Sequence, residues 1–202
     1  MSEMAATAET LPAAARDEAP YTIRPITVDE YHRMLEVGIL YEKEPVELLD
    51  GQLIAMPPQG PAHASVFSAL NALFVHTFGD RALVRPGGPI ELNRISEPEP
   101  DLALVRRTED QYFGSHPKPE DVLLLVEVSH SSLAYDRRQK LSAYARAGIA
   151  EYWIVDLVHR RIEIFAEPQN DRYEAHQTAR PGDSIAPRAF PNDALSVASL
   201  LP

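Results

Sequence analysis

The order of apolar and polar positions predicts a domain in which strands and helices alternate. Apolar residues run almost without interruption through residues 102–105, 122–128 and 151–155, which predicts strands buried on both faces of a sheet. Residues 131–147 have helical periodicity and end before Gly148. A strand, a helix and a further strand in this order predict a right-handed parallel crossover.

The N-terminal half predicts a helix, a hairpin and a second helix. Thr27-Val-Asp-Glu30 has the Ser/Thr-x-x-Glu form of a capping box, so we expect a short helix that ends at Gly38. Asp50-Gly51 separates two β-prone runs and predicts a hairpin. Residues 62–78 place apolar side chains on one face at helical spacing, which predicts an amphipathic helix.

The other segments are predicted to be short strands, a loop and a covering tail. Residues 82–85 and 89–92 are β-prone, and residues 161–165 and 172–177 predict a terminal hairpin. Residues 108–121 are polar and contain Gly and Pro, so we expect a surface loop there. The Pro- and Ala-rich remainder is expected to cover the core.

Composition indicates a globular protein with a single domain. The chain has 202 residues, of which 45% are hydrophobic and 24% charged, enough for one domain with a substantial core over residues 21–202. Residues 1–20 lack the basic start and apolar centre of a secretory signal, so we expect a flexible tail. No apolar run reaches the roughly 20 residues of a membrane span. The absence of cysteine excludes disulfides and thiolate metal sites and fits a reducing, cytoplasmic compartment.

The net charge of −11 argues against a broad electropositive surface of the kind that grips nucleic acid through its phosphates. A local basic groove remains compatible with this charge. Arg106-Arg107 and Arg137-Arg138 are the candidates for such a groove.

Two carboxylates accompany the apolar strands. Asp101 precedes one strand, and Glu127 lies between Val126 and Val128 near the end of another. An acid among aliphatic residues needs a compensating partner. If the two strands pair, both acids converge and can hold a divalent metal through oxygen ligands. The alternatives are a backbone-capping role for Asp101 in a turn and a structural ion pair between Glu127 and Lys140.

Lys140 also has two interpretations. It follows Asp136 by four residues, the spacing of an ordinary ion pair on a helix. Asp136, Lys140 and Tyr144 share one helical face, which allows Lys140 to point at Glu127. An amine beside a metal can stabilise the charge that develops in phosphodiester hydrolysis.

Three further side chains are weaker candidates. Glu47 is either a third metal ligand or an exposed hairpin residue. His63, near the start of a predicted helix, either assists a site or is an ordinary polar residue. His130 is a poor ligand for Mg²⁺, which prefers oxygen.

Several stretches together carry a family resemblance: Glu47-Leu-Leu-Asp-Gly51, His63, Pro100-Asp101, Val126-Glu-Val128, Ser131 to Arg137, Lys140, and Tyr144 to Asp156. They resemble the Uma-two family of bacterial proteins, proposed endonucleases similar to the restriction-endonuclease-like PD-(D/E)XK superfamily. The resemblance implies an α/β fold: a restriction-endonuclease-like core with a central mixed β-sheet flanked by helices, plus an N-terminal helix and β-hairpin.

The resemblance also implies a function, namely metal-dependent hydrolysis of phosphodiester bonds in nucleic acid, with double-stranded DNA as the expected substrate. Asp101 and Glu127 become ligands of Mg²⁺ (or Mn²⁺), and Glu47 completes the metal shell. The superfamily lysine falls where this chain has Ser129, and Lys140 is the residue that can supply the amine from the following helix. Nucleases with this core often act as dimers, so a homodimer is expected.

Two alternatives remain open on the sequence. One is a non-catalytic interaction module that retains the fold, favoured by Ser129 and the acidic composition. The other is a metal-dependent hydrolase of smaller phosphate substrates, which suits the absence of a large basic stripe.

Overall fold

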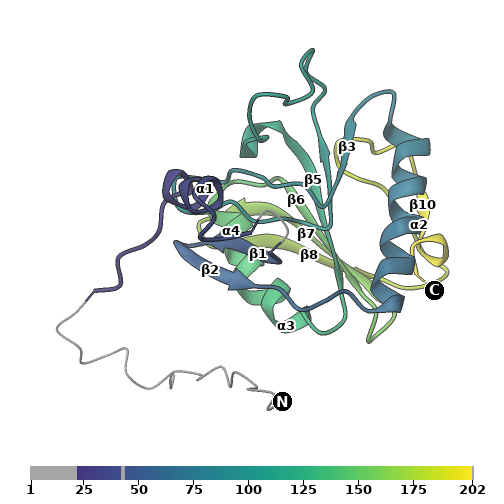
Figure 1. Ribbon diagram of the computed structural model, residues 1–202. Helices are drawn as coiled ribbons and strands as arrows, with labels where there is room; N and C mark the ends of the chain where they lie inside the picture. The colour runs from purple at the N-terminus through teal and green to yellow at the C-terminus, as the bar shows by residue number, and fades with distance from the viewer. Residues whose placement is uncertain (1–21, 42–43, 202) are drawn as a thin grey trace, which may run out of the picture.

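A six-stranded sheet lies at the centre of the computed structural model, which describes residues 22–41 and 44–201. The strand order is β3-β4-β5-β6-β7-β8. These strands are β3 (Leu83–Pro86), β4 (Leu102–Val105), β5 (Val122–Ser129), β6 (Glu151–Asp156), β7 (Arg161–Gln169) and β8 (Arg172–Ala179). Strands β5 and β6 are parallel and the other neighbouring pairs are antiparallel, so the sheet is mixed (Figure 1).

Helices, turns and short strands surround this sheet. In chain order they are α1 (Val28–Glu36), β1 (Val46–Leu49), β2 (Gln52–Ala55), α2 (Pro61–Phe78), the 3-10 turn η2 (Pro119–Asp121), α3 (Leu133–Tyr135), the π-helical segment η3 (Asp136–Lys140), α4 (Leu141–Arg146), β9 (Ser184–Ile185), β10 (Leu195–Ser196) and the 3-10 turn η4 (Val197–Ser199). Strands β1 and β2 form a hairpin, and β9 pairs with β10. Among the described residues, no helix combines the length and the apolar character needed to cross a bilayer.

The sheet has a separate apolar core on each face, because successive side chains of a strand point to opposite sides. Leu124 and Val126 of β5 pack in the cluster that includes α2 and the C-terminal segment. Leu125 packs in the opposite cluster with Tyr144 of α4. Glu127 lies two residues beyond Leu125, so the alternation directs its side chain to the face covered by α4.

The predicted α/β fold with a mixed central sheet is confirmed. The capping box of α1 is present: the Glu30 backbone N–H donates to Thr27 Oγ1 at 3.2 Å, and the Thr27 N–H donates to Glu30 Oε2 at 2.9 Å. The hairpin at Asp50-Gly51, the parallel pairing of β5 with β6, and the terminal hairpin are also confirmed. The flexible tail predicted for residues 1–20 lies outside the described residues.

The strand predicted over residues 89–92 was wrong. Ile90 and Leu92 are buried, as the β-prone pattern suggested. Their backbone N–H groups, however, donate to Pro98 O at 3.0 Å and Ser96 O at 2.9 Å. The segment therefore folds back on the residues that follow it and does not join the sheet.

The helix predicted over residues 131–147 is present as a continuous helical segment from Leu133 to Arg146, but its middle, η3, is π-helical and not α-helical. The Ser132 side chain caps no helix N–H; its Oγ donates to Asp136 Oδ2 at 2.6 Å. Ser129 Oγ, at the end of β5, donates to the same oxygen at 2.6 Å. Asp136 thus joins the helical segment to the strand. π-helical turns occur frequently at functional sites.

We expect Phe74→Ala to destabilise the protein by about 3–5 kcal/mol, because it removes a ring from a closely packed core. Phe74 is fully buried and contacts Phe78 and Trp153, with ring centroids at 5.4 and 6.3 Å. The matched control is Phe113→Ala, since that ring is 96% exposed and its loss should change stability by no more than about 0.5 kcal/mol. Urea unfolding measures both values, and equal losses would contradict this assignment of the core.

Candidate functional site

The pairing of β4 with β5 brings the two predicted acids together. The strands are antiparallel with Leu102 opposite Val126, so Asp101, just before β4, lies beside the end of β5. The Val128 N–H donates to Asp101 Oδ2 at 2.8 Å, and the Asp101 N–H donates to Glu127 Oε2 at 3.4 Å. The register of the two strands therefore determines how close the carboxylates lie.

The Lys140 ammonium lies between two buried carboxylates. Its Nζ is 2.8 Å from Glu127 Oε1 and 3.1 Å from Glu47 Oε2. Two phenols complete the arrangement: Tyr144 donates to Glu127 Oε1 at 2.9 Å, and Tyr135 donates to Glu47 Oε1 at 3.0 Å. Segments far apart in the sequence, namely the β1 hairpin, β5 and the helical segment, therefore meet at one cation.

Burial and charge act against each other in this cluster. Burial alone would lower the pKa of Lys140, but Glu127, Glu47 and Asp136 outweigh it, so the pKa of Lys140 is raised and the amine stays protonated. Burial raises the pKa of Glu127 well above its usual range, against the opposing effect of Lys140. Burial and then Glu47 raise the pKa of Glu99. The acids outnumber the amine, so this site favours an additional cation.

A cleft of about 840 Å³ opens onto these residues. Its lining includes Glu47, Asp101, Glu127 and Lys140, together with His63 and His130. All the hydrogen bonds of the Asp101 carboxylate involve Oδ2, so within the described part of the chain Oδ1 has no hydrogen-bond partner. A free carboxylate oxygen beside further carboxylates is the donor set that Mg²⁺ or Mn²⁺ prefers. The oxygen donors that line the cleft are therefore of the type that suits such an ion.

The structure excludes some alternatives left open by the sequence. Glu47 is fully buried, so it is not an exposed hairpin residue. The Asp136 carboxylate accepts hydrogen bonds from the hydroxyls of Ser129 and Ser132. In the described residues, the ion pairs of Lys140 are with Glu47 and Glu127. Of the two partners that the sequence offered for Lys140, the structure therefore shows the contact with Glu127 and not the helical ion pair with Asp136.

Sequence reasoning undervalued His63 and missed Tyr135 and Tyr144 as members of the site. His63 Nε2 lies 3.0 Å from Asp101 Oδ2, in a side chain that is 14% exposed. The spacing of Tyr144, four residues after Lys140, was a usable signal because both side chains fall on one helical face. No local signal identified Tyr135, since its partner Glu47 lies 88 residues away.

One candidate for a basic groove has another role. Arg137 Nη2 is 2.7 Å from Asp156 Oδ2, and Arg137 Nε is 2.7 Å from Glu163 Oε2. The hydrogen bonds to Glu163 and the charge of both acids raise the pKa of Arg137 despite partial burial. Its guanidinium therefore joins the helical segment to β6 and β7, which makes it a poor candidate for binding a phosphate.

Comparison with known proteins agrees with this fold. A crystal structure from Anabaena variabilis, described as that of a "putative nuclease belonging to DUF820", matches with a TM-score of 0.67 and 19% identity, over 87% of this chain and 97% of that chain. At this identity the match shows a shared fold. No curated protein matches the sequence.

A family model, Uma2, described as "Putative restriction endonuclease", matches residues 28–198. Restriction-endonuclease-like proteins generally use a divalent metal ion. The matched range includes β1, the strands of the central sheet and the whole helical segment that carries Lys140. The family resemblance predicted from the sequence is therefore confirmed: this chain belongs to the Uma2 family.

Proposed function

We propose that this protein is a divalent-metal-dependent endonuclease that hydrolyses phosphodiester bonds in double-stranded DNA. The observation that carries the proposal is the convergence of Glu127 and Glu47 on the buried Lys140 amine, with Asp101 beside Glu127, at the wall of an open cleft. The family description points to the same class of reaction.

In this proposal the carboxylates of Asp101, Glu127 and Glu47 hold Mg²⁺ or Mn²⁺. When bound, such an ion lowers the pKa of water and stabilises negative charge on a phosphoryl group. Lys140 supplies a fixed positive charge near the reacting phosphate, and its orientation is set by the carboxylates it already contacts. Tyr144 and Tyr135 hold the carboxylates of Glu127 and Glu47 in place.

Ser129 is the sequence feature that most favoured a non-catalytic module. Its side chain is fully buried and its hydroxyl binds Asp136, so it helps to anchor the segment that carries Lys140. Lys140 itself lies 2.8 Å from Glu127. The amine missing at position 129 is therefore present in space, which supports the enzyme over the module.

A duplex has two strands to cut, so we further propose that two copies act together as a homodimer. Each copy would then cut one strand of the duplex in its own cleft. Sedimentation of the protein with and without a DNA duplex measures the stoichiometry of the complex.

We expect the wild-type protein to nick supercoiled DNA in the presence of Mg²⁺ or Mn²⁺. Glu127→Gln and Lys140→Met should each lower the rate roughly 100-fold or more, because each removes a charge that the proposed reaction depends on. The measurement is the conversion of supercoiled plasmid to open circles over time. A chelator should abolish the wild-type activity.

The matched control is Glu174→Gln, which makes the same change at an exposed position of β8 outside the cleft. It should cleave at the wild-type rate. If wild type and Glu127→Gln give identical traces, the nuclease proposal is wrong. Turnover of nucleotides or small phosphate esters, with intact plasmid, would instead support the hydrolase of smaller substrates.

We expect the loss of stability in His63→Gln to be larger at about pH 5.5 than at about pH 9. The hydrogen bond to Asp101 raises the pKa of His63 against the opposing effect of burial. A raised pKa in the folded state contributes stability that is complete below the unfolded value of about 6.5 and is lost as pH rises through the folded value. Urea unfolding at the two pH values measures the difference.

His130→Gln is the control for this measurement, because His130 is exposed in the same cleft. It should change stability little at either pH. A loss for His63→Gln that is independent of pH would show that the imidazole contributes by packing and not through its charge.

A further inference from the structure

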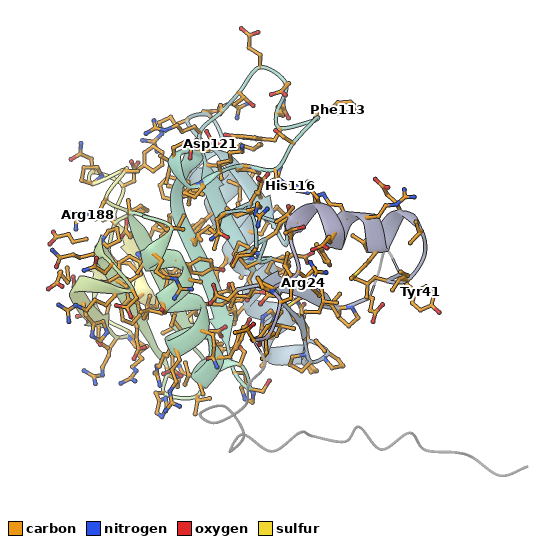
Figure 2. The ribbon with its side chains drawn as sticks, turned by 90° about the vertical axis from the view of Figure 1, so that its left-hand side faces the viewer. Arg24, Tyr41, Phe113, His116, Asp121 and Arg188 are labelled. Carbon is orange, nitrogen blue, oxygen red and sulfur yellow. The ribbon has the colours of Figure 1, made fainter. Side chains whose placement is uncertain are left out.

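His32, Glu97 and His116 meet outside the cleft described above. His32 belongs to α1, Glu97 pairs with Leu48 next to the hairpin, and His116 lies in the loop before η2. Each offers one ligand atom, and these atoms lie within 4.8 Å of one another. In Figure 2, His116 lies on the same loop as Phe113 and nearer to α1 than Phe113 does.

The carboxylate of Glu97 is the group in this cluster that is not fully paired. Its side chain is 2% exposed, and its Oε1 lies 2.7 Å from His32 Nε2. Among the residues that the structure describes, its Oε2 is buried and has no hydrogen-bond partner. In the described ranges no Lys or Arg lies within ion-pair distance of Glu97; its ion pair is with His32. A buried carboxylate oxygen with no donor is costly, and a cation would remove that cost.

Two imidazoles and one carboxylate indicate which cation. Zn²⁺ is commonly bound by nitrogen together with carboxylate oxygen, whereas Mg²⁺ prefers an all-oxygen shell. Ligands at roughly 2.0–2.1 Å from a tetrahedral ion lie about 3.3 Å from each other. Binding of the ion would therefore lengthen the distance between His32 Nε2 and Glu97 Oε1, now 2.7 Å, by a fraction of an ångström. The His32 side chain is 41% exposed, so it has room to move.

We propose that His32, Glu97 and His116 bind Zn²⁺ or a similar transition-metal ion. The ion would fasten α1 and the loop over residues 106–121 to the segment that contains Glu97. The Glu97 N–H donates to Leu48 O at 2.7 Å, and the Glu99 N–H donates to Glu47 Oε2 at 2.9 Å. Ion binding thus stabilises the segment that supports Glu47. The proposal does not depend on nuclease activity.

The test uses the full chain, stripped with a chelator and titrated with Zn²⁺ and separately with Co²⁺. The wild type should bind Zn²⁺ with a rise in Tm, and Co²⁺ should give the intense visible absorption of a tetrahedral site. His116→Gln should weaken binding at this site roughly 100-fold or more, because it removes one of three protein ligands. His116 lies in a surface loop, so we expect this variant to fold.

Two matched variants assign the signal. Asp101→Asn removes a carboxylate charge from the cleft and should keep the Co²⁺ absorption. His130→Gln removes an exposed imidazole and should keep this absorption as well. The proposal is overturned if the wild type gives no tetrahedral absorption and no rise in Tm. It is also overturned if the signal survives His116→Gln and disappears in Asp101→Asn, because the ion would then occupy the cleft. Plasmid nicking in Mg²⁺ tests the nuclease proposal separately.

Discussion

The buried Lys140 ammonium is the interaction on which the site depends. Glu47 and Glu127 are almost completely removed from water, and neither strand could carry its acid there without a compensating charge. Breaking such a buried pair typically costs about 3–5 kcal/mol, because it leaves an uncompensated charge. The amine therefore makes the hairpin, β5 and the helical segment mutually dependent. The same contacts that stabilise the acids also hold them at the wall of the cleft.

The site also depends on the geometry of the sheet. Alternation along β5 directs Glu127 to the face covered by α4, and antiparallel pairing of β4 places Asp101 beside it. A shift of one residue in that register would turn Glu127 toward the apolar cluster beneath α2. Asp136 contributes on the helical side, since the hydroxyls of Ser129 and Ser132 hold it at the end of β5. The register of the strands and the phase of the helical segment therefore together position the few side chains of the site.

The N-terminal elements belong to the site as much as the central sheet does. Glu47 lies in β1, and its carboxylate accepts hydrogen bonds from the Glu99 N–H and from the Tyr135 hydroxyl. The His32–Glu97–His116 cluster is joined to β1 as well, because Glu97 pairs with Leu48. A transition-metal ion there would support the hairpin from outside the cleft. Two different donor sets, one of oxygen and one mixed with imidazole nitrogen, would then suit two different ions.

The sequence by itself determined the main elements and the identity of the central acids. The apolar runs around Leu124 and Trp153, the capping box at Thr27 and the Asp50-Gly51 turn are local signals, and each produced the predicted element. Residues 89–92 were misassigned because burial of Ile90 and Leu92 resembles a strand pattern, whereas their hydrogen bonds depend on residues 96–98.

Only the tertiary structure decided which charged groups meet. The sequence left Asp136 and Glu127 open as partners of Lys140, and the structure places the amine between Glu127 and Glu47. Tyr135 reaches a carboxylate 88 residues away. The His32–Glu97–His116 cluster was likewise invisible in the sequence, because its members come from three separate segments. Periodicity reports which side of an element is buried. The partner of a buried charge is set by packing between elements, which no local pattern records.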